Sequence, residues 1–130
     1  MANPNIVSVA TIEGGNAGWN LSTGLTTTLA ECASNYILKI NRIVCTNVHA
    51  TDAANLDLFV DGMGSGTTGV TTTGADATVY LAKVISVPAN ASLVVLDTPI
   101  YLMEGDILKG GASASGDLDL FISYEVISSS

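Results

Sequence analysis

The stretch Asp117-Leu-Asp-Leu-Phe-Ile-Ser-Tyr-Glu-Val-Ile127 decides the fold class of this 130-residue chain. Apolar residues recur in it at every second position, and the positions between them are mostly polar. The apolar face carries Leu118, Leu120, Ile122, Tyr124 and Val126, and the polar face carries Asp117, Asp119, Ser123 and Glu125. This period of two predicts a β-strand with one face buried and one face in water, which is typical of antiparallel sheets.

The same pattern recurs along the chain. Leu56-Asp-Leu-Phe-Val-Asp61 buries Leu56, Leu58 and Val60 and exposes Asp57 and Asp61. Further strands are expected at 6–12, at 19–22 continuing to 25–30, and at 36–48, 77–87, 92–96 and 99–104, with turns at 14–16, 88–90, 97–99, 104–106 and 115–117. The sequence therefore predicts an all-β fold, an antiparallel β-sandwich of about seven to nine strands, either jelly-roll or immunoglobulin-like.

The length predicts one domain. Residues 16–130 are expected to form the sandwich, and residues 1–15 either an N-terminal arm that adds to a neighbour's sheet or the first strand of the same sandwich. Residues 62–76 hold five glycines and five threonines and predict a long loop, either a partner-binding loop or a flexible hairpin tip. The tentative interface residues are Ile6 and Val9 in the arm and Met63 and Val70 in the loop.

Charge and composition exclude several classes of function. Four Lys and Arg residues against twelve Asp and Glu residues give a net charge of -8, which disfavours binding to nucleic acid or to anionic membranes. The mean hydropathy of +0.46 excludes a disordered chain. The N-terminus lacks the pattern of a secretory signal, and the two cysteines predict either two buried free thiols or one bridge.

No group of residues predicts catalysis or a cofactor. The single histidine, His49, follows Cys45 by four residues, a spacing of about 13 Å along a strand, so a Cys–His pair is not expected and His49 is assigned to a solvated loop. If the strands that carry Asp57, Asp61, Asp117 and Asp119 were neighbours, the four carboxylates would form either a solvated acidic face or a calcium site. The lone tryptophan, Trp19, is expected in the core or at an interface rather than as a ligand platform. The chain is expected not to be an enzyme, and no catalytic, metal or cofactor residue is assigned.

The C-terminal half resembles small virion proteins of tailed bacteriophages, in particular marine and cyanobacterial phages. The resemblance lies in Val87-Pro-Ala-Asn-Ala-Ser-Leu-Val-Val-Leu-Asp-Thr-Pro-Ile-Tyr-Leu-Met-Glu-Gly-Asp-Ile-Leu108 and in Ser115-Gly-Asp-Leu-Asp-Leu-Phe-Ile-Ser-Tyr-Glu-Val-Ile-Ser128, and more loosely in Asn41-Arg-Ile-Val-Cys-Thr-Asn-Val48. These segments are strands and turns, and they cover about half of the chain. They imply a β-sandwich that assembles on a virion, and they carry no catalytic residue.

The resemblance implies a capsid decoration (cement) protein that binds the outer shell through the major capsid protein or other virion proteins. Such a protein is expected to act as a homo-oligomer, a trimer among the options, in a virion assembled in the bacterial host cytoplasm. A neck, tail or fibre component of the same virion is the first alternative. A carbohydrate- or calcium-binding sandwich module is the second, although aromatic residues make up only 5% of the chain.

Overall fold

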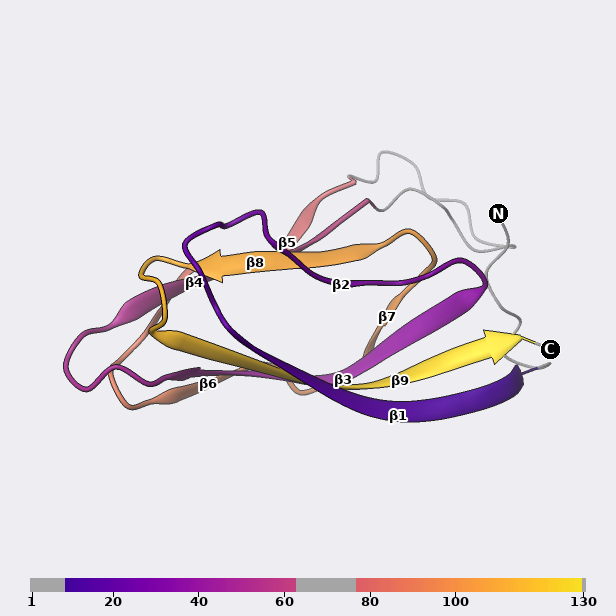
Figure 1. Ribbon diagram of the computed structural model, residues 1–130, viewed down its shortest axis with the longest axis horizontal. Coiled ribbons are helices and arrows are strands. Elements are labelled where there is room, and N and C mark those ends of the chain that lie inside the picture. The colour runs from indigo at the N-terminus through magenta and orange to yellow at the C-terminus, as the bar shows by residue number, and fades with distance from the viewer. Residues whose placement is uncertain (1–8, 63–76, 130) are drawn as a thin grey trace.

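The computed structural model describes residues 9–62 and 77–129, and these residues form nine strands (Figure 1). In chain order the strands are β1 (Val9–Asn20), β2 (Thr28–Glu31), β3 (Tyr36–Asn47), β4 (Ala54–Asp61), β5 (Val79–Val87), β6 (Ser92–Leu96), β7 (Ile100–Leu102), β8 (Ile107–Ala112) and β9 (Leu118–Ser129). The described residues contain no helix long and apolar enough to cross a membrane.

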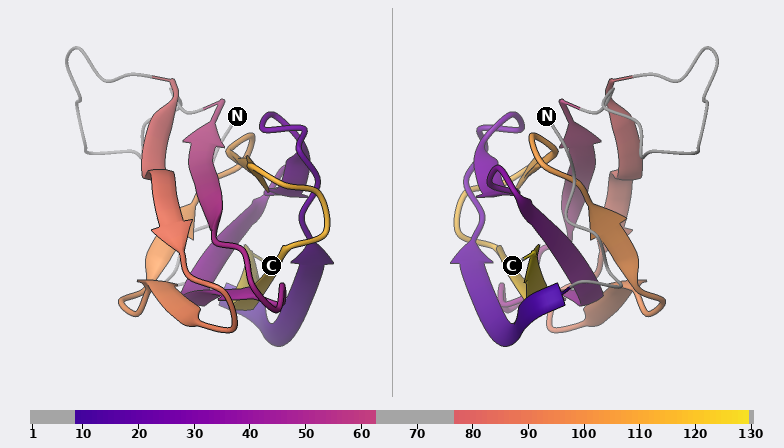
Figure 2. Two further views of the ribbon diagram at one scale, coloured as in Figure 1. Left: turned by 90° about the vertical axis from the view of Figure 1, so that its left-hand side faces the viewer. Right: turned by 90° about the vertical axis from the view of Figure 1, so that its right-hand side faces the viewer.

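The nine strands form two antiparallel sheets that face each other (Figures 1 and 2). Sheet A has the order β1-β9-β3, and both β6 and β7 pair with the far side of β3; sheet B has the order β2-β8-β4-β5. The strands pair in a nested order, like one long hairpin that is folded over on itself. β1 pairs with β9, β2 with β8, β3 with β7 and β6, and β4 with β5. This nesting, together with the added pairs β3–β9 and β4–β8, is the strand arrangement of a jelly roll. The predicted antiparallel β-sandwich is therefore confirmed, with the jelly-roll arrangement rather than the immunoglobulin-like one.

The core lies between the sheets and follows the alternation seen in the sequence. On β9, Leu118, Leu120 and Ile122 are almost fully buried, and on β4, Leu56 and Leu58 are fully buried. The long strands predicted at 36–48 and 77–87 correspond to β3 and β5. Both are bent, because the registers of β3–β9 and of β4–β5 shift along their length.

Strand β8 is the one element that the sequence does not predict, because glycines are depleted in strands. Gly110 and Gly111 lie in its middle, and the packing explains both. A Cβ on Gly110 would overlap the carbonyl oxygen of Asp57 on β4, and a Cβ on Gly111 would come within 2.8 Å of the carbonyl oxygen of Ser22. The two glycines let the neighbouring backbone approach this central strand closely.

Strand β1 contradicts the turn expected at residues 14–16. These residues lie in the middle of a 12-residue strand and pair in register with Glu125, Tyr124 and Ser123 of β9. Glycines and an asparagine favour turns in isolation, but here the pairing with β9 along the whole strand overrides that local preference. The described part of the segment 1–15 is thus continuous with the sandwich.

The turn expected at residues 104–106 is present and is held by buried carboxylates. Glu104 and Asp106 are both buried, and Gly105 between them has a φ of 87°. The Glu104 carboxylate accepts a hydrogen bond from the backbone N–H of Asn35, and the Asp106 carboxylate accepts one from the N–H of Met103. Burial raises the pKa of Asp106. This part of the sequence resemblance therefore has a structural role, in joining β7 to β8.

Candidate functional site

The imidazole of His49 lies 3.8 Å from the exposed carboxylate of Asp52, and the two cysteine thiols lie in the interior. Cys32 and Cys45 are free and buried, and burial raises the pKa of each thiol from 9.0 to about 11. His49 lies in the loop after β3, where its Nδ1 accepts hydrogen bonds from the backbone N–H groups of Thr51 and Asp52. This histidine therefore organises a turn, and the two thiols belong to the interior.

The expected acidic face is not formed, because the strands that carry its carboxylates belong to different sheets. Asp57 and Asp61 lie on β4 in sheet B, whereas Asp119 lies on β9 in sheet A. Asp61 forms an ion pair of 2.8 Å with Lys109, which helps to hold the pKa of that carboxyl at about 2. Within the part of the chain that the structure describes, no three His, Cys, Asp or Glu side chains are grouped to hold a metal ion.

Three of the four tentative interface residues, Ile6, Met63 and Val70, lie outside the described residues. The fourth, Val9, begins β1, and its backbone pairs with Ser129 at the end of β9. In the described residues, two other surfaces have the properties expected of a binding site. One is the edge of sheet B at β5, and the other is a groove on the outer face of sheet A.

The β5 edge, defined by Val79, Tyr80, Leu81, Val84 and Ile85, is unusually apolar for an exposed strand. These five side chains are exposed by 36% to 59%, with Val84 the most exposed. Strand β5 ends the sheet, and β4 is its only partner among the described strands. Exposed apolar edge strands are sites where another chain attaches or aggregates.

Two bulges shape this edge. Lys83 and Val84 together lie opposite the single residue Asp57, and Leu81 is an extra residue between Tyr80 and Ala82. Val84 has a φ of 51°, which is unfavourable for a β-branched residue, and its N–H donates a 2.6 Å hydrogen bond to the Asp57 carboxylate. The fold thus holds Val84 outward in a strained conformation.

The one charged side chain on β5, that of Lys83, does not cover the apolar side chains of the β5 edge. The ammonium group of Lys83 lies 4.9 Å from the centre of the Tyr80 ring, and that ring packs against Phe59 with centroids 5.0 Å apart. The lysine is therefore drawn onto its own strand by a cation–π contact, and the apolar side chains beside it stay open to solvent.

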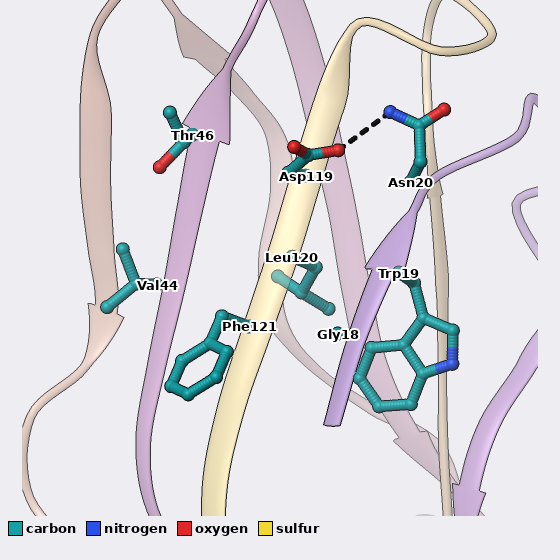
Figure 3. Close-up of a pocket in the computed structure, with 8 residues that line it drawn as sticks. All are labelled: Gly18, Trp19, Asn20, Val44, Thr46, Asp119, Leu120 and Phe121. Atoms are coloured by element: carbon teal, nitrogen blue, oxygen red, sulfur yellow. Dashed lines mark hydrogen bonds between the residues drawn. The ribbon is translucent and has the colours of Figure 1, made fainter. Parts of the chain in front are cut away.

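The second surface, the sheet A groove, has a volume of about 490 Å³ and is lined by β1, β3 and β9 (Figure 3). Two rows of side chains cross the sheet there, since paired residues lie directly opposite each other. The apolar row is Gly18, Phe121, Val44 and Val94, and the polar row beside it is Asn20, Asp119, Thr46 and Ser92.

The polar row is ordered by side-chain hydrogen bonds. The Asn20 amide donates a 2.7 Å hydrogen bond to the Asp119 carboxylate, which Figure 3 marks, and the Thr46 and Ser92 hydroxyls are hydrogen-bonded at 2.9 Å. The Phe121 side chain is 47% exposed and lies on the side of β9 that faces Val44 (Figure 3).

One feature of the sequence indicates this groove. Phe121 occupies a position of the polar face in the stretch 117–127, where a strand exposed to water does not need an aromatic ring. Its neighbours come from β1 and β3, and the sequence does not predict which strands flank β9. Trp19 packs against the core, as expected.

Comparison with family models, curated proteins and solved structures finds no match to this chain. The functional assignment consequently depends on the two surfaces and on the resemblance noted in the sequence.

Proposed function

We propose that this protein is a non-enzymatic structural component of a tailed-bacteriophage virion, and that it decorates the outer capsid shell by binding the major capsid protein. The sequence resemblance at residues 87–108 and 115–128 supports this proposal. In the fold these residues are strands β6 and β7, the start of β8, nearly all of β9 and the adjoining turns, which is consistent with an assembly role rather than a chemical one.

The observation that carries the proposal is the β5 edge. Five exposed apolar side chains on one strand are costly to leave in water, and a protein partner that covers them recovers that free energy. No acidic residue lies on β5, so the strand itself adds no local repulsion to that of the net charge of -8.

The bulges disfavour one mode of contact. Each bulge interrupts the regular spacing of the backbone N–H and C=O groups, so a partner strand cannot pair along the whole of β5. We therefore expect the shell to receive the side chains of the β5 edge in an apolar recess, with Val84 at the centre of the contact.

The first experiment measures how many copies of the chain each virion holds. Quantitative mass spectrometry of purified particles from the source of the sequence gives the ratio of this chain to the major capsid protein. A ratio near one, or a simple fraction of it, supports shell decoration. A few copies per hundred capsid subunits would move the protein to the neck, tail or fibre, and absence from the particles would refute the virion assignment.

The second experiment tests the surface. Val84→Lys places a charge in the β5 edge, and Val48→Lys places the same charge at a valine that is 51% exposed in the loop after β3. When each protein is added to shells that lack it, we expect Val84→Lys to weaken cosedimentation at least tenfold, because the charge must be desolvated, and Val48→Lys to bind as the wild type does. Equal binding of both variants would show that the β5 edge is not the contact.

A further inference from the structure

The sheet A groove matches a ligand that is apolar on one side and hydroxylated on the other. The exposed Phe121 ring and Val44 offer an apolar surface. Directly beside them the Asp119 carboxylate offers hydrogen-bond acceptors, and the hydrogen-bonded Thr46–Ser92 hydroxyl pair keeps one O–H to donate. Sugar rings combine a face of C–H groups with a rim of hydroxyl groups. We propose that the sheet A groove binds a neutral oligosaccharide, with one sugar ring against Phe121 and its hydroxyls on the polar row.

Gly18 supports this proposal from the opposite strand. Glycine weakens a strand, and a Cβ at Gly18 would meet nothing closer than 3.5 Å, so neither backbone conformation nor packing within the chain requires glycine there. Gly18 pairs with Phe121, and the Phe121 ring lies toward Val44 rather than over the glycine (Figure 3). The missing side chain thus leaves the groove open beside the ring.

The polar row is suited to hydroxyl groups in particular. Asp119 uses its Oδ1 to accept from Asn20, and among the described residues its Oδ2 takes part in no hydrogen bond. A carboxylate oriented by a neighbouring amide is a strong acceptor for a ligand O–H. Because Asn20 already fixes the carboxylate, less conformational entropy is lost when the ligand binds.

Charge selects a neutral ligand over an anionic one. Asp119 is the only charged side chain that lines the groove within the described part of the chain, and the whole chain carries -8. Phosphorylated sugars and uronic acids would be repelled by this carboxylate. A lone carboxylate also lacks the several oxygen ligands that calcium requires, so a saccharide that coordinates through calcium is not expected.

The test is a titration of the labelled protein followed by the ¹H–¹⁵N NMR spectrum. The probes are maltohexaose, cellohexaose and mannohexaose, each raised to about 10 mM, a concentration that detects millimolar binding. We expect at least one of them to shift the amide signals of residues 18–20, 44–46 and 119–121. Failure of all three to shift these signals would overturn the proposal, and so would shifts confined to other residues.

Matched variants then locate the binding surface. Phe121→Ala should weaken binding at least about tenfold because it removes the apolar platform, whereas Tyr101→Ala should leave binding unchanged. The control is close, since Tyr101 is also an aromatic residue of sheet A and is also 47% exposed. Asp119→Asn keeps the shape of the side chain and should weaken binding as well. Equal effects of Phe121→Ala and Tyr101→Ala would refute the site.

A basic peptide is the competing ligand for an acidic groove. Hexalysine in the same titration should not shift the groove signals; shifts with hexalysine but with none of the three sugars would overturn the saccharide assignment. This site uses no residue of the β5 edge, so either proposal can fail without the other.

Discussion

Replacing Gly110 with alanine tests the packing that the jelly roll imposes on its centre. Gly110 on β8 lies opposite Leu58 on β4, and both strands are flanked on each side by other strands of sheet B. An added Cβ would overlap the carbonyl oxygen of Asp57 and lie 3.1 Å from the Cα and Cδ1 of Leu58. Because two of these atoms belong to the backbone, β4 must move away from β8.

Overpacking of this kind costs about 1–3 kcal/mol, and we expect the upper half of that range because backbone cannot rotate aside. Changing glycine to alanine also lowers the conformational entropy of the unfolded chain, which stabilises the folded state by about 0.4–1 kcal/mol. The net destabilisation is therefore about 2 kcal/mol, or a fall in Tm of roughly 6–8 °C for a domain of this size.

Gly14→Ala is the matched control, since Gly14 also lies in a strand and its added Cβ would meet nothing within 4 Å. Only the entropic gain then applies, so this variant should be unchanged or more stable by about 0.5 kcal/mol. Equilibrium unfolding in urea, followed by the fluorescence of the single tryptophan, Trp19, measures both changes. If Gly110→Ala unfolds at the same urea concentration as Gly14→Ala, the close approach of β4 to β8 is wrong.

Three further outcomes are expected. The hydrogen bond from Lys109 lowers the pKa of Asp61 to about 2, so the ionised Asp61 carboxylate stabilises the fold fully above about pH 5, and this stabilisation is lost as the pH falls from about 4 toward 2. Asp61→Asn should therefore make acid unfolding less steep in this range. An unchanged pH profile would contradict the Asp61–Lys109 pair. With pKa values of about 11, Cys32 and Cys45 should resist a thiol reagent at about pH 8 in the native protein and react fully after denaturation; rapid native reaction would contradict their burial. Asn47 is buried and donates hydrogen bonds to the carbonyl oxygens of Asp52 and Val87, so Asn47→Ala should lower the free energy of unfolding by about 2–3 kcal/mol in urea titrations, and a loss below about 0.5 kcal/mol would contradict this role.

The sequence predicts those parts of the fold whose signal is local. Strands β4 and β9 are recognisable because their apolar residues recur at every second position, and the structure confirms the buried face at Leu56, Leu58 and Val60 of β4 and at Leu118, Leu120 and Ile122 of β9. The other faces are less exposed than predicted, because Phe59 on β4 and Ile127 on β9 are buried as well. Strand β8 is not recognisable because its two glycines are required by neighbours distant in the sequence, the Asp57 carbonyl on one side and the Ser22 carbonyl on the other. Likewise, the expected turn at 14–16 is wrong because β9, about 110 residues away, pairs with that segment.

The candidate surfaces were harder to predict for the same reason. The exposed apolar residues of β5 look in the sequence like those of a buried strand, and only the place of β5 at the end of sheet B shows that they face water. The sheet A groove combines residues from three strands whose pairing the sequence does not contain. Phe121 alone carried a local sign, as an aromatic residue in the polar half of an alternating strand.

The positions of the two surfaces make the proposed functions compatible. The β5 edge belongs to sheet B, whereas the groove lies on the outer face of sheet A and is lined by β1, β3 and β9. A copy held on the shell by Val84 and its neighbours would therefore leave the groove free to bind a saccharide at the particle surface. Because the surfaces share no residue, the effects of Val84→Lys and Phe121→Ala should be independent. The double variant should bind shells as weakly as Val84→Lys does, measured by cosedimentation, and should bind the saccharide as weakly as Phe121→Ala does, measured by titration. If Val84→Lys alone weakened saccharide binding, the two surfaces would be coupled through the sandwich.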